Sequence, residues 1–296
     1  MIYINKGIKT MENVKREMDP TKTLLLAIIA MILIGALLLS LPMCNKQPMK
    51  MIDSLFVSTS AVCVTGLTTV IPVEQFTAIG QIILLALIQI GGIGFMTMIS
   101  IVLIVIGKKL NLSDRILIRE SLNQNSFKGL IKLVKRICMY TLVIEIIGAV
   151  ILSIRFIPNF GLKNGIWFSI FHSISAFCNA GFDLLGTTSM MQYAGDCLVC
   201  LTLMTLIIIG GLGFTVWDDI VENIRSKRKM GFLTLHTKIV LLITAILLVT
   251  GMASTFIIEK DNLQTMGEDK LRNTNIKICF SIHNTENSRI LYYASK

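Results

Sequence analysis

The chain has 296 residues, of which 53% are hydrophobic and 16% are charged, and its net charge is +10. Soluble domains carry about 25% charged residues, so this composition argues against one. Lysine and arginine gather in three segments, 6–22, 108–136 and 225–238, and are sparse between them. This alternation is typical of a multi-pass membrane protein with cytoplasmic basic loops, and it gives no reason to expect a nucleic-acid partner.

Five apolar runs are long enough to cross a hydrocarbon core of roughly 30 Å as helices. They are Leu24–Leu41, Ile79–Ile106, Ile137–Ile157, Cys197–Val216 and Ile239–Ile258. The first run is longer than the apolar part of a signal peptide, and no cleavage site of the usual small residues follows it. We therefore expect it to be a retained span. With the basic loops inside, the runs predict five crossings of the plasma membrane and a cytoplasmic N-terminus.

One sequence unit occurs twice. Phe56–Leu67 reads FVSTSAVCVTGL and Phe171–Phe182 reads FHSISAFCNAGF, which share Phe, two Ser, Ala, Cys and Gly without gaps. Further along, IGGIGF at Ile90–Phe95 is matched by IGGLGF at Ile209–Phe214. Both pairs keep their order, and their offsets differ by only four residues. The sequence therefore predicts one structural unit used twice.

Each unit is expected to contain a span, a short helix, an irregular loop and a second span. The short helices, Met51–Val62 and Ile166–Phe177, cannot cross a bilayer. Irregular backbone at membrane depth is tolerated where protein buries it or where it lines a watery cavity. The fold class predicted is an all-α polytopic membrane protein with repeated span–pore-loop–span units, two complete and a third begun.

The expected organisation follows from these elements. A cytoplasmic N-terminal segment (1–22) leads into the first unit (23–106), a basic cytoplasmic loop (107–136), the second unit (137–221), another basic loop (222–238), the first span of a third unit (239–258) and a polar tail (259–296). Met11 is an alternative start, with Met1–Thr10 as an upstream extension.

The two loops that follow the short helices have the properties of an ion filter. A potassium filter replaces the hydration shell of the ion with backbone carbonyls, which requires an extended loop with glycine where ordinary residues are disfavoured. The short helix before it directs its partly negative C-terminal end at the cation. The candidate residues are Val64, Thr65, Gly66, Leu67 and Thr68 in the first loop, and Asn179, Ala180, Gly181 and Phe182 in the second. Potassium would be held by carbonyls near Thr65, Gly66, Ala180 and Gly181.

With their serine-containing short helices, these loops resemble the pore loops of the Trk/Ktr/HKT superfamily of potassium transporters, over roughly Pro20–Glu259. The resemblance implies potassium uptake, four units in a complete chain, and filter glycines at Gly66 and Gly181. Glycine at the first position goes with potassium preference in the plant branch, where serine goes with sodium. No enzymatic activity and no cofactor are expected.

The compact N-terminal unit is most similar to the bacterial Ktr-type membrane subunit. That resemblance implies a homodimer surrounded by membrane lipid, a cytosolic nucleotide-binding regulatory subunit of the KtrA/TrkA type, and sodium as a stimulating ion.

The polar tail falls where a third pore loop is due. Codons permitted for Phe280–Tyr293, read one nucleotide later, can encode FQSITxRTAGFYT, which resembles the third loop of the family. We therefore expect Arg272–Lys296 to be a frameshifted reading of that loop. Because a filter needs four loops, the chain by itself is expected to be an incomplete pore, unstable or non-conducting.

Other residues carry weaker expectations. Glu145 lies in an apolar span, either as a functional group or as the partner of a Lys or Arg on a neighbouring helix. His172 is expected to be a hydrogen-bonded packing residue, and Asp183 is placed to attract cations. Cys197 and Cys200 open an apolar helix and are expected to pack rather than to bind zinc. The glycines of the second repeated motif are expected to allow close helix packing, and they are Gly91, Gly92, Gly94, Gly210, Gly211 and Gly213. The acidic pair Asp218 and Asp219 is expected to be solvated.

Two alternatives remain open at this point. The chain could be a non-conducting membrane scaffold or regulator derived from such a transporter. It could also be a secondary transporter with broken helices, although that class usually has inverted repeats and the units here run parallel. An enzyme is not indicated, because the three histidines are scattered and no nucleophile–base or metal-binding arrangement is present.

Overall fold

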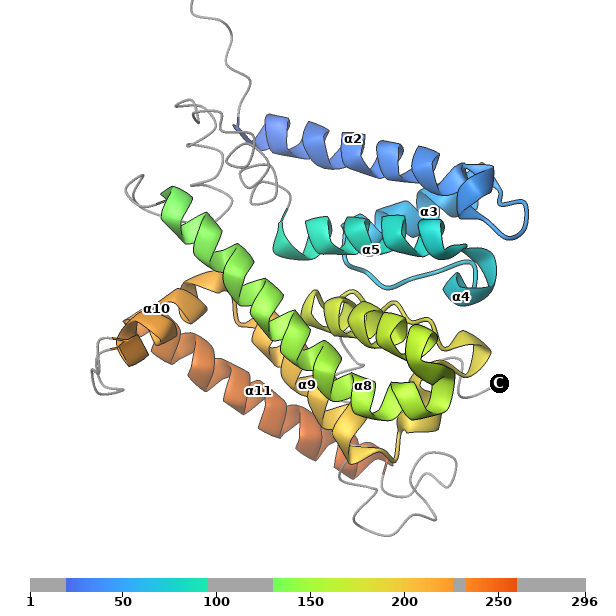
Figure 1. Cartoon of the computed structure of the whole chain (residues 1–296). Coiled ribbons are helices and arrows are strands. Elements are labelled where there is room, and N and C mark those ends of the chain that lie inside the picture. The colour runs from blue at the N-terminus through green and yellow to red at the C-terminus, as the bar shows by residue number, and fades with distance from the viewer. Residues whose placement is uncertain (1–19, 95–129, 226–232, 260–296) are drawn as a thin grey trace, which may run out of the picture.

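The computed structural model describes residues 20–94, 130–225 and 233–259, and within these ranges the regular structure is helical (Figure 1). The first group of elements is α2 (Pro20–Ser40), η1 (Pro42–Cys44), α3 (Met51–Val62), α4 (Pro72–Gln75) and α5 (Ala78–Ile93). The second group is α8 (Leu130–Phe177), η2 (Gly186–Tyr193), α9 (Cys197–Gly211), α10 (Phe214–Arg225) and α11 (Leu235–Glu259).

Two described helical segments are long and apolar enough to cross a membrane, Val134–Phe177 and Leu235–Ser254. A third is obtained if η2 and α9, which meet at an angle of 103°, are counted as one span. The apolar helices α2, α3 and α5 are shorter over their described residues. The chain is thus an all-α membrane protein, and the five-crossing topology stays a prediction.

The outer faces of the long helices are apolar and exposed. Leu37 on α2, Val150 on α8 and Leu247 on α11 are 57%, 60% and 63% exposed. Apolar faces of this extent are a liability in water, whereas they match the hydrocarbon of a bilayer. The described helices are therefore arranged for lipid on the outside.

In the first group, α3 packs between α2 and α5 (Figure 1). The close approach of α3 to α2 depends on Gly35, where a side chain would collide with Ser58 and Leu87. The hydroxyl of Ser58 donates to the carbonyl of Ile32 at 2.8 Å. The polar side chain of the short helix is thereby satisfied inside an apolar environment.

The second group repeats this packing. The long helix α8 is broken at Gly161, whose φ is +77°, so its second part (162–177) folds back on its first part (130–160). The hydroxyl of Ser173 donates to the carbonyl of Glu145 at 2.7 Å. A side chain at Gly148 would collide with Ser173 and Leu206. These contacts match those of Gly35 and Ser58 in the first group, one for one.

Several boundaries differ from the expected ones. The helix α9 ends at Gly211 rather than continuing to Val216, because Gly213 has a φ of +87° and α10 starts afresh at Phe214. Gly94 ends α5 in the same way with a φ of +91°. The helix α2 begins inside the segment expected as 1–22, α8 begins inside 107–136, and α10 and α11 extend into 222–238. The predicted tail, 260–296, lies outside the described residues.

Candidate ion-conduction site

The short helix α3 and the second part of α8 end with the same backbone motif. The amide of Thr65 donates to the carbonyl of Ser60, and the amide of Ala180 donates to that of Ser175, both at 2.8 Å. Each acceptor lies five residues before its donor, which is the hydrogen bond of a Schellman motif. The predicted loops therefore leave their helices along the same path.

This path requires backbone angles in the left-handed region. Val64 has a φ of +55° and Asn179 a φ of +58°, while Gly66 and Gly181 have +75° and +68°. Asparagine and glycine tolerate this region, but a β-branched valine there is an outlier. Such strain costs about 1–3 kcal/mol and is found mainly at functional sites. The conformation at Val64 thus marks the first loop as a functional candidate.

The two loops contact each other at the predicted glycines. A Cβ atom built at Gly66 would lie 2.6 Å from the carbonyl oxygen of Ala180 and 3.1 Å from the Cα of Gly181. The backbone of one loop therefore lies directly against the backbone of the other. Three of the nine predicted ion-binding residues are brought together in this contact.

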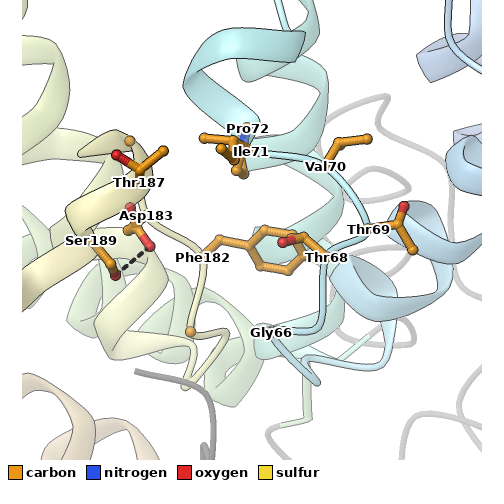
Figure 2. Close-up of a pocket in the computed structure, with 12 residues that line it drawn as sticks. Gly66, Thr68, Thr69, Val70, Ile71, Pro72, Phe182, Asp183, Thr187 and Ser189 are labelled. Atoms are coloured by element: carbon orange, nitrogen blue, oxygen red, sulfur yellow. Dashed lines mark hydrogen bonds between the residues drawn. The ribbon is translucent and has the colours of Figure 1, made fainter. Parts of the chain in front are cut away.

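A cavity of about 180 Å³ lies beside this contact. Figure 2 shows Phe182 of the second loop directed toward Thr68 of the first. The walls come from both loops, from the start of α4 and from η2; they are Gly66, Thr68, Thr69, Val70, Ile71, Pro72, Gly181, Phe182, Asp183, Gly186, Thr187 and Ser189. Backbone and hydroxyl groups make up its polar surface, together with one carboxylate.

The carboxylate of Asp183 also holds the wall of the cavity together. It accepts a hydrogen bond from the hydroxyl of Ser189 at 2.8 Å (Figure 2). It also accepts one from the amide of Leu185 at 3.0 Å. Asp183 therefore fixes the turn into η2 and places a carboxylate in the wall of the cavity.

The remaining loop residues, and the equivalent serines of the two short helices, differ in burial and in hydrogen bonding. The hydroxyl of Ser175 donates to the carbonyl of Phe182 at 2.7 Å and accepts from its amide at 3.0 Å. The hydroxyl of Ser60, at the equivalent position of α3, is buried and has no hydrogen-bond partner among the described residues. The side chain of Thr65 is exposed, and that of Leu67 is half-buried.

His172 is a packing residue, as predicted. It is buried, its Nδ1 lies 2.6 Å from the carbonyl of Phe168, and its Nε2 accepts from the amide of Leu184 at 3.3 Å. The rings of Phe156 and Phe171 pack edge-on against it. The imidazole thereby ties the short helix to the chain that leaves the second loop.

The first glycines of the repeated motif support the ends of the short helices. A Cβ at Gly91 would lie 3.0 Å from the carbonyl carbon of Val62, and one at Gly210 would lie 2.9 Å from that of Phe177. The prediction of close packing is confirmed at these two positions. Gly94 instead ends its helix, as Gly213 does, so for these last glycines backbone angle is the main requirement.

Polar contacts between the two groups were missed by sequence reasoning. The indole of Trp167 donates to Gln81 at 2.7 Å, and the amide of Gln89 donates to Glu145 at 2.8 Å. Of the two alternatives for Glu145, the Lys or Arg partner is not found: within the described ranges its side chain is hydrogen-bonded to Gln89 instead. Gln81 and Gln89 are eight residues apart on one face of α5, and this spacing was the available signal.

The acidic pair at the start of α10 is not simply solvated, contrary to expectation. Asp218 forms an ion pair with Arg136 of α8 at 3.0 Å. Asp219 accepts hydrogen bonds from the amide and the hydroxyl of Thr234, each at 2.9 Å. Both carboxylates therefore fix α10 to its neighbours.

Cys200 packs as predicted, because it is buried and its thiol donates to the carbonyl of Tyr193.

These features define an all-helical membrane protein in which two glycine loops, each following a short helix, meet beside a cavity. The chain belongs to the TrkH family, described as cation transport proteins, whose family model matches residues 6–260.

Three relatives illustrate the similarity. The chain is 42% identical over 254 residues to the potassium/sodium uptake protein NtpJ of Enterococcus hirae, covering 85% of this chain and 55% of that protein. It is 44% identical to the Ktr system potassium uptake protein B of Bacillus subtilis, covering 84% and 55%. It is 42% identical to the protein of the same name from Vibrio alginolyticus, covering 83% and 53%. The chain thus spans about half the length of these relatives.

Proposed function

We propose that this chain forms part of a potassium-uptake pore and that each of its two loops supplies part of the selectivity filter. The observation that carries the proposal is the contact of Gly66 with the carbonyl of Ala180. It juxtaposes two loops that leave short helices along the same path, with glycines at matching positions. Carbonyls from neighbouring loops are the groups that a potassium filter requires.

The electrostatics of the short helices support a cation as substrate. Both helices end at the loops, so the negative ends of their dipoles face the proposed ion path. Asp183 adds a carboxylate to the cavity beside the loops. The names of the three relatives refer to potassium uptake, and one also refers to sodium. Glycine rather than serine at position 66 favours potassium as the preferred ion.

The complete transporter is proposed to contain four span–loop–span units. The matching contacts of Gly35 with Ser58 and of Gly148 with Ser173 support the assignment of the first two units. The complete protein is further proposed to be a homodimer in the plasma membrane, with a cytoplasmic N-terminus, a cytosolic nucleotide-binding regulatory subunit and stimulation by sodium. The proposal for these partners rests on the multi-component Ktr systems named in the relatives.

Complementation tests the proposal. The full-length transporter containing this sequence would be expressed in cells that lack their own potassium uptake. Growth at low potassium, with uptake of the potassium analogue Rb⁺, is the expected result. A well-expressed protein that restores neither growth nor Rb⁺ uptake would overturn the proposal and favour a non-conducting scaffold. The present chain, expressed alone, is expected to restore neither because it supplies two of the loops.

A further inference from the structure

The carboxamide of Gln89 on α5 lies between two groups of the second unit. Its nitrogen donates to the carboxyl oxygen of Glu145 at 2.8 Å. Its oxygen accepts from the thiol of Cys178, with the sulfur 3.9 Å away. One side chain of the first unit thus contacts both the span and the end of the short helix in the second unit.

Glu145 is tied to the same short helix through its backbone. Its carbonyl accepts the hydroxyl hydrogen bond of Ser173 at 2.7 Å, and the residue is only 8% exposed. A carboxyl group buried in an apolar span destabilises the fold unless it is hydrogen-bonded. The hydrogen bond from the amide of Gln89 therefore holds α5 firmly to Glu145. The first part of α8, the short helix and α5 are thus joined by hydrogen bonds around Glu145.

These hydrogen bonds lie beside the start of the second loop. Cys178 directly precedes Asn179, which has the left-handed φ that turns the chain into the loop. Gly92, one turn after Gln89 on α5, lies against the same cysteine: a Cβ there would be 2.5 Å from the Cβ of Cys178. A shift of Cys178 would therefore move Ala180, whose carbonyl lies against Gly66.

We propose that Gln89 and Glu145 are positioning residues for the second filter loop. They hold Cys178 against α5 and thereby set the distance between the carbonyl of Ala180 and the first loop. Cation discrimination depends on that distance, because the carbonyls must replace the hydration shell at the spacing suited to potassium. The inference rests on the proposed function for its selectivity consequence, while the contact itself is testable without transport.

A second contact between the units provides a matched control. Trp167 donates to Gln81 at 2.7 Å, and Gln81 lies on the same helix, two turns before Gln89. Trp167 belongs to the start of the short helix, ten residues before its end at Phe177. Gln81→Leu removes this hydrogen bond, together with the one that the Gln81 amide donates to the carbonyl of Phe76 at 3.2 Å, and leaves the contacts of Cys178 in place.

The first experiment measures ion preference in the full-length transporter. Gln89→Leu and Glu145→Leu are each expected to lower the preference for K⁺ over Na⁺ about tenfold, the effect of losing a hydrogen bond to an acidic group. Glu145→Gln keeps an acceptor and should retain the wild-type preference, as should the control Gln81→Leu. The variant with both leucines should prefer K⁺ over Na⁺ to the same extent as either single variant, because each single change already removes the hydrogen bond between Gln89 and Glu145. Wild-type preference in well-expressed Gln89→Leu would overturn the proposal.

The second experiment uses the full-length transporter in detergent and does not depend on transport. N-ethylmaleimide labelling would be followed at each cysteine by mass spectrometry of its peptide. Cys178 should react several-fold faster in Gln89→Leu and Glu145→Leu than in the wild type or in Gln81→Leu. Cys200, which is buried elsewhere, should not change. Unchanged reactivity of Cys178 in both leucine variants would overturn the positioning role, whether or not the full-length protein transports potassium.

Discussion

Replacement of Gly66 by alanine perturbs the proposed filter most directly. Gly66 has a φ of +75°, and its new Cβ would lie 2.6 Å from the carbonyl oxygen of Ala180. The left-handed conformation costs an alanine about 1 kcal/mol, and relief of the overlap costs about 2 kcal/mol more. If that strain of about 3 kcal/mol falls on the loops, the preference for potassium over sodium falls by up to about 100-fold.

The assay is competition between K⁺ and Na⁺ for Rb⁺ uptake by the full-length transporter. Two control glycines distinguish an effect on the filter from a general loss of stability. No described atom lies within 4 Å of a Cβ at Gly161 or at Gly195. Gly161 has a positive φ of +77°, whereas Gly195 does not. Gly161→Ala should lower stability and keep selectivity, while Gly195→Ala should change neither. Wild-type selectivity in well-expressed Gly66→Ala would refute the assignment of Gly66 to the filter.

Three further predictions follow from the packing, the topology and the tail. Gly210→Ala should sharply reduce the yield of folded protein, because its Cβ would collide with the carbonyl of Phe177, whereas Gly211→Ala should be tolerated because its nearest contact is 3.7 Å away; equal yields in detergent chromatography would contradict this. A cysteine introduced at Lys227 should resist impermeant maleimide in intact cells, since the basic segment is expected inside; labelling from outside would reverse the topology. The gene should encode a TAGF-containing loop when the codons for Phe280–Tyr293 are read one nucleotide later, and its absence from the gene sequence would remove the frameshift hypothesis.

The short helices and the loops that follow them could be predicted because the same sequence motif occurs twice in the chain. Met51–Val62 is confirmed as a separate helix, and the second short helix ends at Phe177 as expected. A turn between Ile137–Ile157 and Ile166–Phe177 was expected, and the structure places it at Gly161. The break at Gly213 was not predicted, because hydropathy carries no information on backbone angles. A repeated glycine motif is consistent both with close packing and with helix termination, and the structure uses it for both.

The partners of polar groups were the part that the sequence could not supply. Glu145 and Gln89 are 56 residues apart on different helices, and an amide was no more obvious a partner than a lysine. The same holds for the ion pair of Asp218 with Arg136. Side-chain pairing between helices depends on their rotation and depth, which sequence periodicity fixes only to within a turn.

The most direct test of the central claim is the position of a bound cation. Crystals of the full-length transporter grown with Rb⁺ would be measured for anomalous scattering at the Rb⁺ absorption edge. The account predicts a peak beside the loops, within coordinating distance of carbonyls among Thr65, Gly66, Ala180 and Gly181. Crystals of transport-competent protein that bind Rb⁺ elsewhere, with no peak at these carbonyls, would contradict it.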